Sequence, residues 1–160
     1  MEIRTAVPAD LDAVTALEAA CFPPAEAAPR SALAVRLTAF PHTFWLLWQG
    51  QELLAMVGGM TARDRDLCDE MYAGDTRYDP DGPWLMIFTV GSRPDCRGKG
   101  YPSRLMAEAI RAARAQGRAG LVLTCKEGLV AYYQRFGFVN EGVSSSEHGG
   151  AVWYQMRLAF

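Results

Sequence analysis

A glycine-rich segment between an apolar run and a helix is the first feature of this sequence that could do chemistry. It reads Arg97-Gly98-Lys99-Gly100-Tyr101-Pro102. Glycines let backbone N–H groups approach a ligand closely, and the start of a helix adds unpaired N–H groups and partial positive charge. With the side chains of Arg97 and Lys99 beside them, these groups predict a site for a phosphate or pyrophosphate.

Two common phosphate-binding motifs do not fit this segment. A P-loop has the pattern GxxxxGK followed by serine or threonine, whereas Gly100 follows Lys99 here. A dinucleotide fingerprint has the pattern GxGxxG, and Ser103 occupies the place of its last glycine. A glycine-rich loop alone also fits a plain tight turn, so its assignment depends on the rest of the chain.

Apolar patterns on both sides of the segment predict the elements that hold it. Residues 84–90 (WLMIFTV) are mostly apolar, which is typical of a strand buried on both faces. A helix is expected from Pro102, because proline suits the first turn of a helix. Residues 121–125 (LVLTC) predict a second buried strand. Strand, helix and strand in this order predict a right-handed crossover in a parallel or mixed sheet.

The remaining chain predicts further elements around this unit, and together they indicate a mixed α/β fold in one domain over residues 1–160. Further strands are expected at 2–6, 44–48, 52–62, 138–143 and 151–158, and helices at about 10–20, 25–39 and 127–136. The pair Gly58-Gly59 would weaken a strand interior and indicates a bulge. The polar segment 64–83 is predicted as a loop that could cover a site, with a short helix near 67–72.

Composition and charge exclude several classes of protein. Sixteen lysines and arginines against eighteen acidic residues give a net charge of −2, so the basic excess typical of nucleic-acid binders is missing. No apolar run approaches the roughly 20 residues of a membrane helix. The four cysteines show no metal-binding spacing, which favours reduced thiols and no metal. The N-terminus has no signal-peptide pattern, so we expect a cytoplasmic protein.

The glycine-rich segment resembles motif A of the GNAT acetyltransferase superfamily, Arg/Gln-x-x-Gly-x-Gly/Ala. Pro102 stands where the family has glycine or alanine, and it removes one backbone N–H donor. Residues 124–138 (TCKEGLVAYYQRFGF) look like the family's motif B, which ends in the same way. The run Cys21-Phe22-Pro23, followed by acidic Glu26, is similar to the branch that includes arylalkylamine N-acetyltransferases.

The resemblance implies a fold, a co-substrate and its binding residues. The fold is a central twisted mixed sheet of about six to seven strands flanked by about four helices. The co-substrate is acetyl-CoA, and no metal is implied. The pantetheine arm would pair like an extra strand with Phe88, Thr89 and Val90. The pyrophosphate would rest on the loop formed by Arg97, Gly98, Lys99, Gly100, Tyr101, Pro102 and Ser103.

Acetyl transfer to an amine needs a base, a positioned thioester, an oxyanion donor and an acid for the leaving thiolate. By the same resemblance Tyr133 is the general acid, and a backbone N–H near Val90 is the oxyanion donor. A phenol titrates near about 10 and a thiol near about 8.5, so the proton can pass at modest cost. The neighbouring Tyr132 projects about 100° away on a helix. A packed aromatic role for Tyr133 is the alternative.

The general base is less clearly marked. Arylalkylamine N-acetyltransferases carry relay histidines on the strand before motif A, and residues 84–87 (WLMI) contain none. The candidate bases are Glu70, Asp69, Glu26, His148 and a water chain to bulk solvent. Each of these side chains also fits an ordinary surface position. Cys125 has no histidine near it in the sequence and is interpreted as a structural thiol.

The expected function is therefore acetyl-CoA-dependent transfer of an acetyl group to the primary amine of a small molecule. Two alternatives stay open: a non-catalytic acyl-CoA sensor, and an acetyltransferase that acts on a protein amine. The expected partner is the small-molecule amine, with neither nucleic acid nor membrane. The resemblance also makes a homodimer a possible assembly of this chain.

Overall fold

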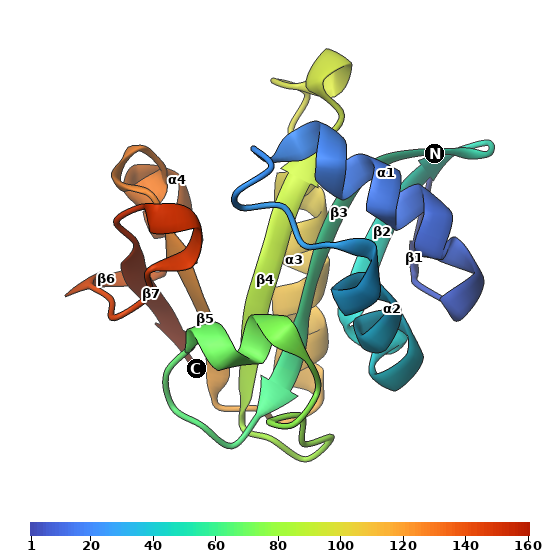
Figure 1. Cartoon of the computed structure of the whole chain (residues 1–160). Helices are drawn as coiled ribbons and strands as arrows, with labels where there is room; N and C mark the ends of the chain where they lie inside the picture. The colour runs from blue at the N-terminus through green and yellow to red at the C-terminus, as the bar shows by residue number, and fades with distance from the viewer.

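A seven-stranded mixed sheet forms the centre of the computed structural model, which describes all 160 residues, Met1–Phe160 (Figure 1). The strands lie in the order β1-β2-β3-β4-β5-β7-β6. Their bounds are β1 Glu2–Thr5, β2 Phe44–Gln49, β3 Glu52–Ala62, β4 Trp84–Ser92, β5 Gly120–Cys125, β6 Val139–Val143 and β7 Tyr154–Ala159. Only β4 and β5 pair in parallel; the other neighbours are antiparallel. The predicted mixed α/β fold is confirmed.

Helices cover both faces of the sheet (Figure 1). Helices α1 (Leu11–Cys21) and α2 (Arg30–Ala39) pack on one face, and α3 (Tyr101–Ala115) packs on the other. The buried side chains fall into two clusters, one for each face. Along β4, Leu85 and Ile87 belong to the α3 cluster and Met86 to the α1–α2 cluster. This alternation explains why the sequence of β4 is apolar throughout its first part, from Trp84 to Phe88.

Several element boundaries differ from the sequence expectation. The second helix begins at Arg30 instead of residue 25, because residues 23–27 form a turn in which the N–H groups of Glu26 and Ala27 both donate to Pro23 O at 2.9 Å. The helix expected at 127–136 is a 3-10 turn, η5 (Glu127–Leu129), followed by a short α4 (Val130–Gln134).

The last strand and the long loop also differ in detail. Strand β7 starts at Tyr154 instead of residue 151, because the 3-10 turn η6 (His148–Gly150) precedes it with Gly149 at φ 63°. The short helix expected near 67–72 is the 3-10 helix η3 (Asp69–Ala73). Met71 anchors η3 to the α1–α2 cluster with 1% of its surface exposed.

Candidate active site

The sheet opens between its two parallel strands. Strands β4 and β5 are paired only from Trp84 to Met86, against residues 120–122. Beyond Met86, β4 stays paired with β3 on its other side, and β5 stays paired with β7. The second half of β4 therefore presents backbone N–H and C=O groups to a gap inside the molecule, where a narrow ligand can pair with them.

A β-bulge at Phe88 lies on the rim of this gap. The register of β3 pairs residue 59 with Ile87 and residue 58 with Thr89, so Phe88 has no partner on β3. The predicted irregularity at the pair Gly58-Gly59 is present. A Cβ on Gly59 would lie 1.9 Å from the carbonyl oxygen of Met86, so only glycine fits this close approach.

The bulge turns two successive side chains of β4 towards α1 and α2. Thr89 Oγ1 donates a hydrogen bond of 3.0 Å to Glu18 of α1, and the guanidinium of Arg36 on α2 lies over the Phe88 ring at 4.8 Å. Bulges often re-aim side chains next to functional sites. Here the bulge brings Phe88 and Thr89 into contact with the only two charged side chains that α1 and α2 bury.

One cavity, which we name the loop cavity, lies at the amino end of α3 and has a volume of about 600 Å³. Gly98 and Gly100 line it with φ of +80° and +75°, a region that favours glycine. A Cβ on either residue would meet no atom within 4 Å, so the space beside the backbone is open to a ligand. Other predicted loop residues line the same cavity: Arg97, Pro102 and Ser103.

A second cavity, the sheet cavity, has a volume of about 340 Å³ and lies between the α1–α2 segment and the opened part of the sheet. Three predicted cofactor residues of β4 line it: Phe88, Thr89 and Val90. Thr124 and Cys125 of β5 form the opposite wall. The volume is near the lower end of the range for small-molecule sites, roughly 300–1,000 Å³.

Tyr133 of α4 lines both cavities and is 5% exposed. Burial raises the pKa of its phenol well above the ordinary value, so the hydroxyl keeps its proton and can serve as a donor. The hydroxyls of Tyr72 and Tyr132 are engaged with Thr124 at 3.2 Å and Ser103 at 2.8 Å. The hydroxyl of Tyr133 has no such partner in the chain and is free to meet a ligand.

Glu18 is a buried carboxylate in the wall of the sheet cavity, with 4% of its surface exposed. It accepts hydrogen bonds of 3.0 Å from Thr89 Oγ1 and from the N–H of Ala28. Burial raises the pKa of Glu18, which suits a general base. Sequence reasoning missed it, although it continues the apolar stripe of Val14 and Leu17, where an acidic residue is unusual.

Arg36 is the buried cation of the same cavity and is 2% exposed. Its Nη2 donates to the carbonyl oxygen of Tyr72 at 3.0 Å, and its Nε is buried without a partner. Desolvation by burial lowers the pKa of the guanidinium. Sequence reasoning missed Arg36 as well; the signal was its place at helical spacing beside Leu33 and Leu37.

Three of the proposed bases take part in contacts that hold the walls together. Glu26 forms an ion pair with Lys126 at 2.7 Å, and its carbonyl oxygen lies 2.7 Å from His148 Nε2. His148 also stacks on Tyr72 with ring centroids 4.9 Å apart. Asp69 is exposed and hydrogen-bonds the backbone of residues 146–147 and the Ser146 side chain.

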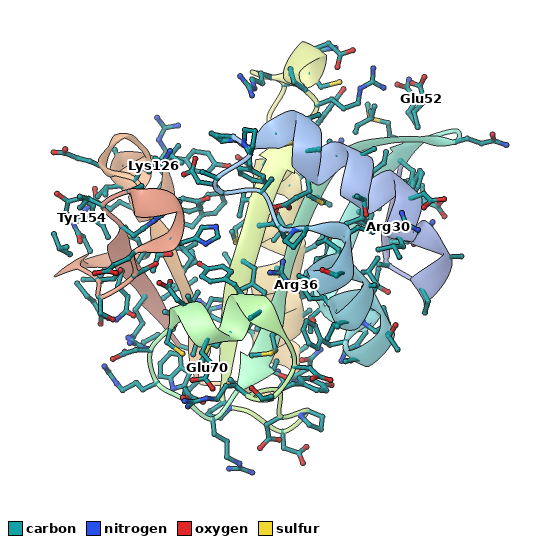
Figure 2. All side chains as sticks on the ribbon, in the orientation of Figure 1. Arg30, Arg36, Glu52, Glu70, Lys126 and Tyr154 are labelled. Carbon is teal, nitrogen blue, oxygen red and sulfur yellow. The ribbon has the colours of Figure 1, made fainter.

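Three predicted site residues lie outside both cavities. Glu70 is exposed on η3 and forms an ion pair with Arg77 at 2.9 Å (labelled in Figure 2). Lys99 is exposed, and the side chain of Tyr101 packs against the α3 face of the core. The sequence signals for these residues were the charge of an acidic loop and adjacency to the glycines, and neither signal determines where a side chain points.

The mixed sheet, opened between two parallel strands beside a glycine loop at a helix start, is the kind of arrangement that the resemblance to the GNAT superfamily implied. Residues 11–138 match the Acetyltransferase (GNAT) family, a span that contains both cavities' main walls and Tyr133. The chain therefore belongs to the GNAT family of acetyl-CoA-dependent acetyltransferases, as the resemblance implied. No protein of curated function matches the chain by sequence.

Solved structures share this fold over nearly the whole chain. The GphF GNAT-like decarboxylase in complex with isobutyryl-CoA is 21% identical, with a TM-score of 0.82 over 99% of both chains. The loading GNATL domain of CurA from Lyngbya majuscula is 13% identical, with a TM-score of 0.84 over 99% of this chain and 96% of that one. The ribosomal-protein-S18-alanine N-acetyltransferase from Escherichia coli is 17% identical, with a TM-score of 0.73 over 99% of this chain and 92% of that one.

These comparisons do not support the arylalkylamine branch expected from Cys21-Phe22-Pro23. The run is a turn that ends α1, and a short turn of this kind carries little information about a branch.

None of the helices has the length and apolar character needed to cross a bilayer.

Proposed function

We propose that the chain moves an acetyl group from acetyl-CoA to the primary amine of a small molecule, by direct attack of the amine on the thioester. The observation that carries this proposal is the position of Tyr133, whose side chain lines both cavities. A thioester that enters through the loop cavity would place its sulfur near this phenol, with the acceptor in the sheet cavity beyond it.

The two cavities suit the two ends of the co-substrate. The pyrophosphate would lie in the loop cavity, against open glycine backbone and the positive end of α3. Pro102 offers no N–H there, so the remaining donors come from the other residues of the loop. The pantetheine arm would pair with the free edge of β4 from Phe88 to Val90, as a strand would.

In this proposal Glu18 is the general base and replaces Glu70, which lies outside the cavities. Glu18 takes a proton from the ammonium form of the acceptor, and the freed nitrogen lone pair attacks the thioester carbonyl. The tetrahedral intermediate then collapses: the C–S bond breaks, and Tyr133 protonates the leaving thiolate. The tyrosinate that results takes the second proton from the nitrogen, which leaves the neutral amide and restores the phenol. Because burial raises the pKa of Glu18, its carboxylate is a stronger base than one in water.

The walls of the sheet cavity favour a small acceptor over a protein. Two contacts join segments of its wall that are far apart in the sequence: Glu26 with Lys126, and Glu26 with His148. A peptide acceptor would need an open groove at this place. The volume of about 340 Å³ instead suits a molecule of amino-acid or small-amine size.

The test is acetyl transfer from acetyl-CoA to a panel of arylalkylamines, polyamines, amino acids and peptides, read by the mass of the product. We expect one class of small amine to be acetylated. Acetylation of peptides alone would indicate a protein acceptor. Binding of acetyl-CoA without turnover on any amine would indicate the sensor function instead.

A second function is favoured by Arg36 and by two of the structural relatives. The structures named as a GNAT-like decarboxylase and a GNATL loading domain have TM-scores of 0.82 and 0.84, above the 0.73 of the N-acetyltransferase. A buried guanidinium suits a substrate with a carboxylate. In a decarboxylation, the bond from the carboxylate to Cα of the thioester breaks, CO₂ leaves, the electron pair passes into an enolate, and a proton is added at Cα.

Malonyl-CoA and methylmalonyl-CoA without any amine test this second function. The appearance of acetyl-CoA or propionyl-CoA by mass, faster than in buffer alone, would establish decarboxylation. Unchanged thioesters, together with an acetylated amine in the first panel, would rule it out.

A further inference from the structure

We propose that Arg36 binds a carboxylate group of the substrate in the sheet cavity, so that the enzyme acts on carboxylate-bearing molecules. This inference takes one element from the proposed function: that the reacting groups meet in the sheet cavity. The structural basis is a buried, incompletely partnered guanidinium in the cavity wall (Figure 2).

Arg36 has fewer partners than a buried arginine needs. Of its five N–H donors, the chain engages one, from Nη2 to the carbonyl oxygen of Tyr72 at 3.0 Å. Its Nε is fully buried and unpartnered, and no carboxylate of the chain forms an ion pair with it. Buried charges are normally paired and hydrogen-bonded, because desolvation is costly. The missing partner is therefore an anion from outside the chain.

The shape of the guanidinium indicates which anion fits. One face lies over the Phe88 ring at 4.8 Å, so the group is held flat and a partner must approach in its plane. A guanidinium carries pairs of parallel N–H groups in its plane, and such a pair matches the two oxygens of a carboxylate. In the proposed function the phosphates of the co-substrate have a separate place, the loop cavity.

The second buried charge of the cavity, Glu18, has the opposite sign. Each of its oxygens accepts one hydrogen bond, from Thr89 Oγ1 or from the N–H of Ala28, and keeps a second lone pair; Glu18 does not pair directly with Arg36. One wall can therefore receive a nitrogen near Glu18 and a carboxylate near Arg36. A small amino acid carries both groups. A carboxyacyl thioester carries the carboxylate alone, and would place it on the same arginine.

The test compares substrates that differ only in the carboxylate, in two arms. In the acceptor arm, kcat/KM for acetylation is measured for alanine and phenylalanine and for their primary amides. In the acyl arm, the dissociation constants of malonyl-CoA and acetyl-CoA are measured by calorimetry. We expect the carboxylate form to be preferred about tenfold to hundredfold in one arm, the range of a charge-assisted pair. That arm identifies the source of the carboxylate.

Two arginines of α2 provide a matched pair of variants (both labelled in Figure 2). Arg36→Met should abolish the preference, and it should fold, because an apolar side chain of similar size often replaces a buried charge without loss of stability. Arg30→Met should leave the preference unchanged, because Arg30 is exposed and pairs with Asp12 at 2.5 Å. Arg36→Lys keeps the charge without the planar fork, so the preference should fall but persist.

The outcomes separate this inference from the proposed function. No carboxylate preference in either arm, or a preference that survives in Arg36→Met, would overturn the inference even if amines are acetylated. An Arg36-dependent preference for malonyl-CoA with no acetylated amine would support the inference and overturn the N-acetyltransferase proposal.

Discussion

Asp69 holds Ser146 across 77 residues of sequence, with Ser146 Oγ donating to its carboxylate at 2.5 Å. The N–H of Glu147 donates to the second carboxylate oxygen at 2.9 Å. The segment after β3 and the segment before β7 are thereby tied together. They then supply Tyr72 and His148, whose rings stack in the wall of the sheet cavity.

Asp69→Ala should loosen this wall without touching the loop cavity. We expect a higher KM for the acceptor, an unchanged KM for acetyl-CoA, and a free energy of unfolding lower by about 1 kcal/mol. Steady-state kinetics and thermal unfolding measure these effects. The control is Glu70→Ala, which removes only an exposed ion pair with Arg77. Equal effects of the two substitutions would contradict the role of Asp69.

Tyr133→Phe should lower kcat by about 10²- to 10⁴-fold, the usual contribution of a general acid. The affinity for acetyl-CoA should stay nearly unchanged, because the ring still fills its place beside Phe138. Tyr132→Phe is the comparison: its hydroxyl bonds Ser103 in the loop cavity, so it should weaken co-substrate binding more than turnover. An unchanged kcat in Tyr133→Phe would remove the acid role.

Glu18→Gln should remove the limb of the pH profile on which activity rises with pH. Burial raises the pKa of Glu18, so in the wild type the active carboxylate forms only as pH rises through that raised value. The amide cannot take a proton, and kcat should fall across the whole range. A profile of kcat/KM with the same rising limb in the variant would show that another group is the base.

The same residue predicts a pH dependence of stability. A carboxyl whose pKa is raised by folding binds its proton more tightly in the folded state, so stability falls as pH rises from the unfolded value through the folded one. The melting temperature of the wild type relative to Glu18→Gln should therefore decrease over this interval. A difference that does not vary with pH would show that folding leaves the titration of Glu18 unchanged.

Gly100→Ala should weaken co-substrate binding beyond its effect on stability. Gly100 has a φ of +75°, so alanine is expected to destabilise the fold by about 1–2 kcal/mol. Gly117→Ala is a close control, because Gly117 has a φ of +74°, also with open space, and lies outside both cavities. Both variants should lose similar stability, and calorimetry should show weaker acetyl-CoA binding only for Gly100→Ala.

The fold was predictable where a sequence pattern is compatible with only one structural environment. The apolar run at 84–90 must be buried on both faces, and Gly58-Gly59 marked the irregularity opposite Phe88. The start of α2 was misplaced because residues 25–28 are compatible with a helix by composition, whereas Pro29 and the turn at Pro23 delay it.

The candidate site was only partly predictable. The glycine loop and Tyr133 belong to the two family motifs, and the spacing of residues within each motif predicts where they lie in the fold. Glu18 and Arg36 were missed because a charged residue on a helix is normally assigned to the solvent face. Their burial depends on the bulge at Phe88 and on how α1 and α2 pack together, which the local sequence does not reveal. The sequence signals for Glu70 are its charge and its place in a polar loop, and neither determines where its side chain lies.

The gap between β4 and β5 gives the sheet internal edges, in addition to those of β1 and β6. Exposed strand edges tend to recruit other chains and aggregate. Here residues of the turn after α1 and His148 of η6 line the sheet cavity beside these edges, so the edges face other parts of the same chain. The chain thus keeps an unpaired strand edge with which a thin ligand can pair. Because this edge lies inside the molecule, it is not presented to a strand of a second copy.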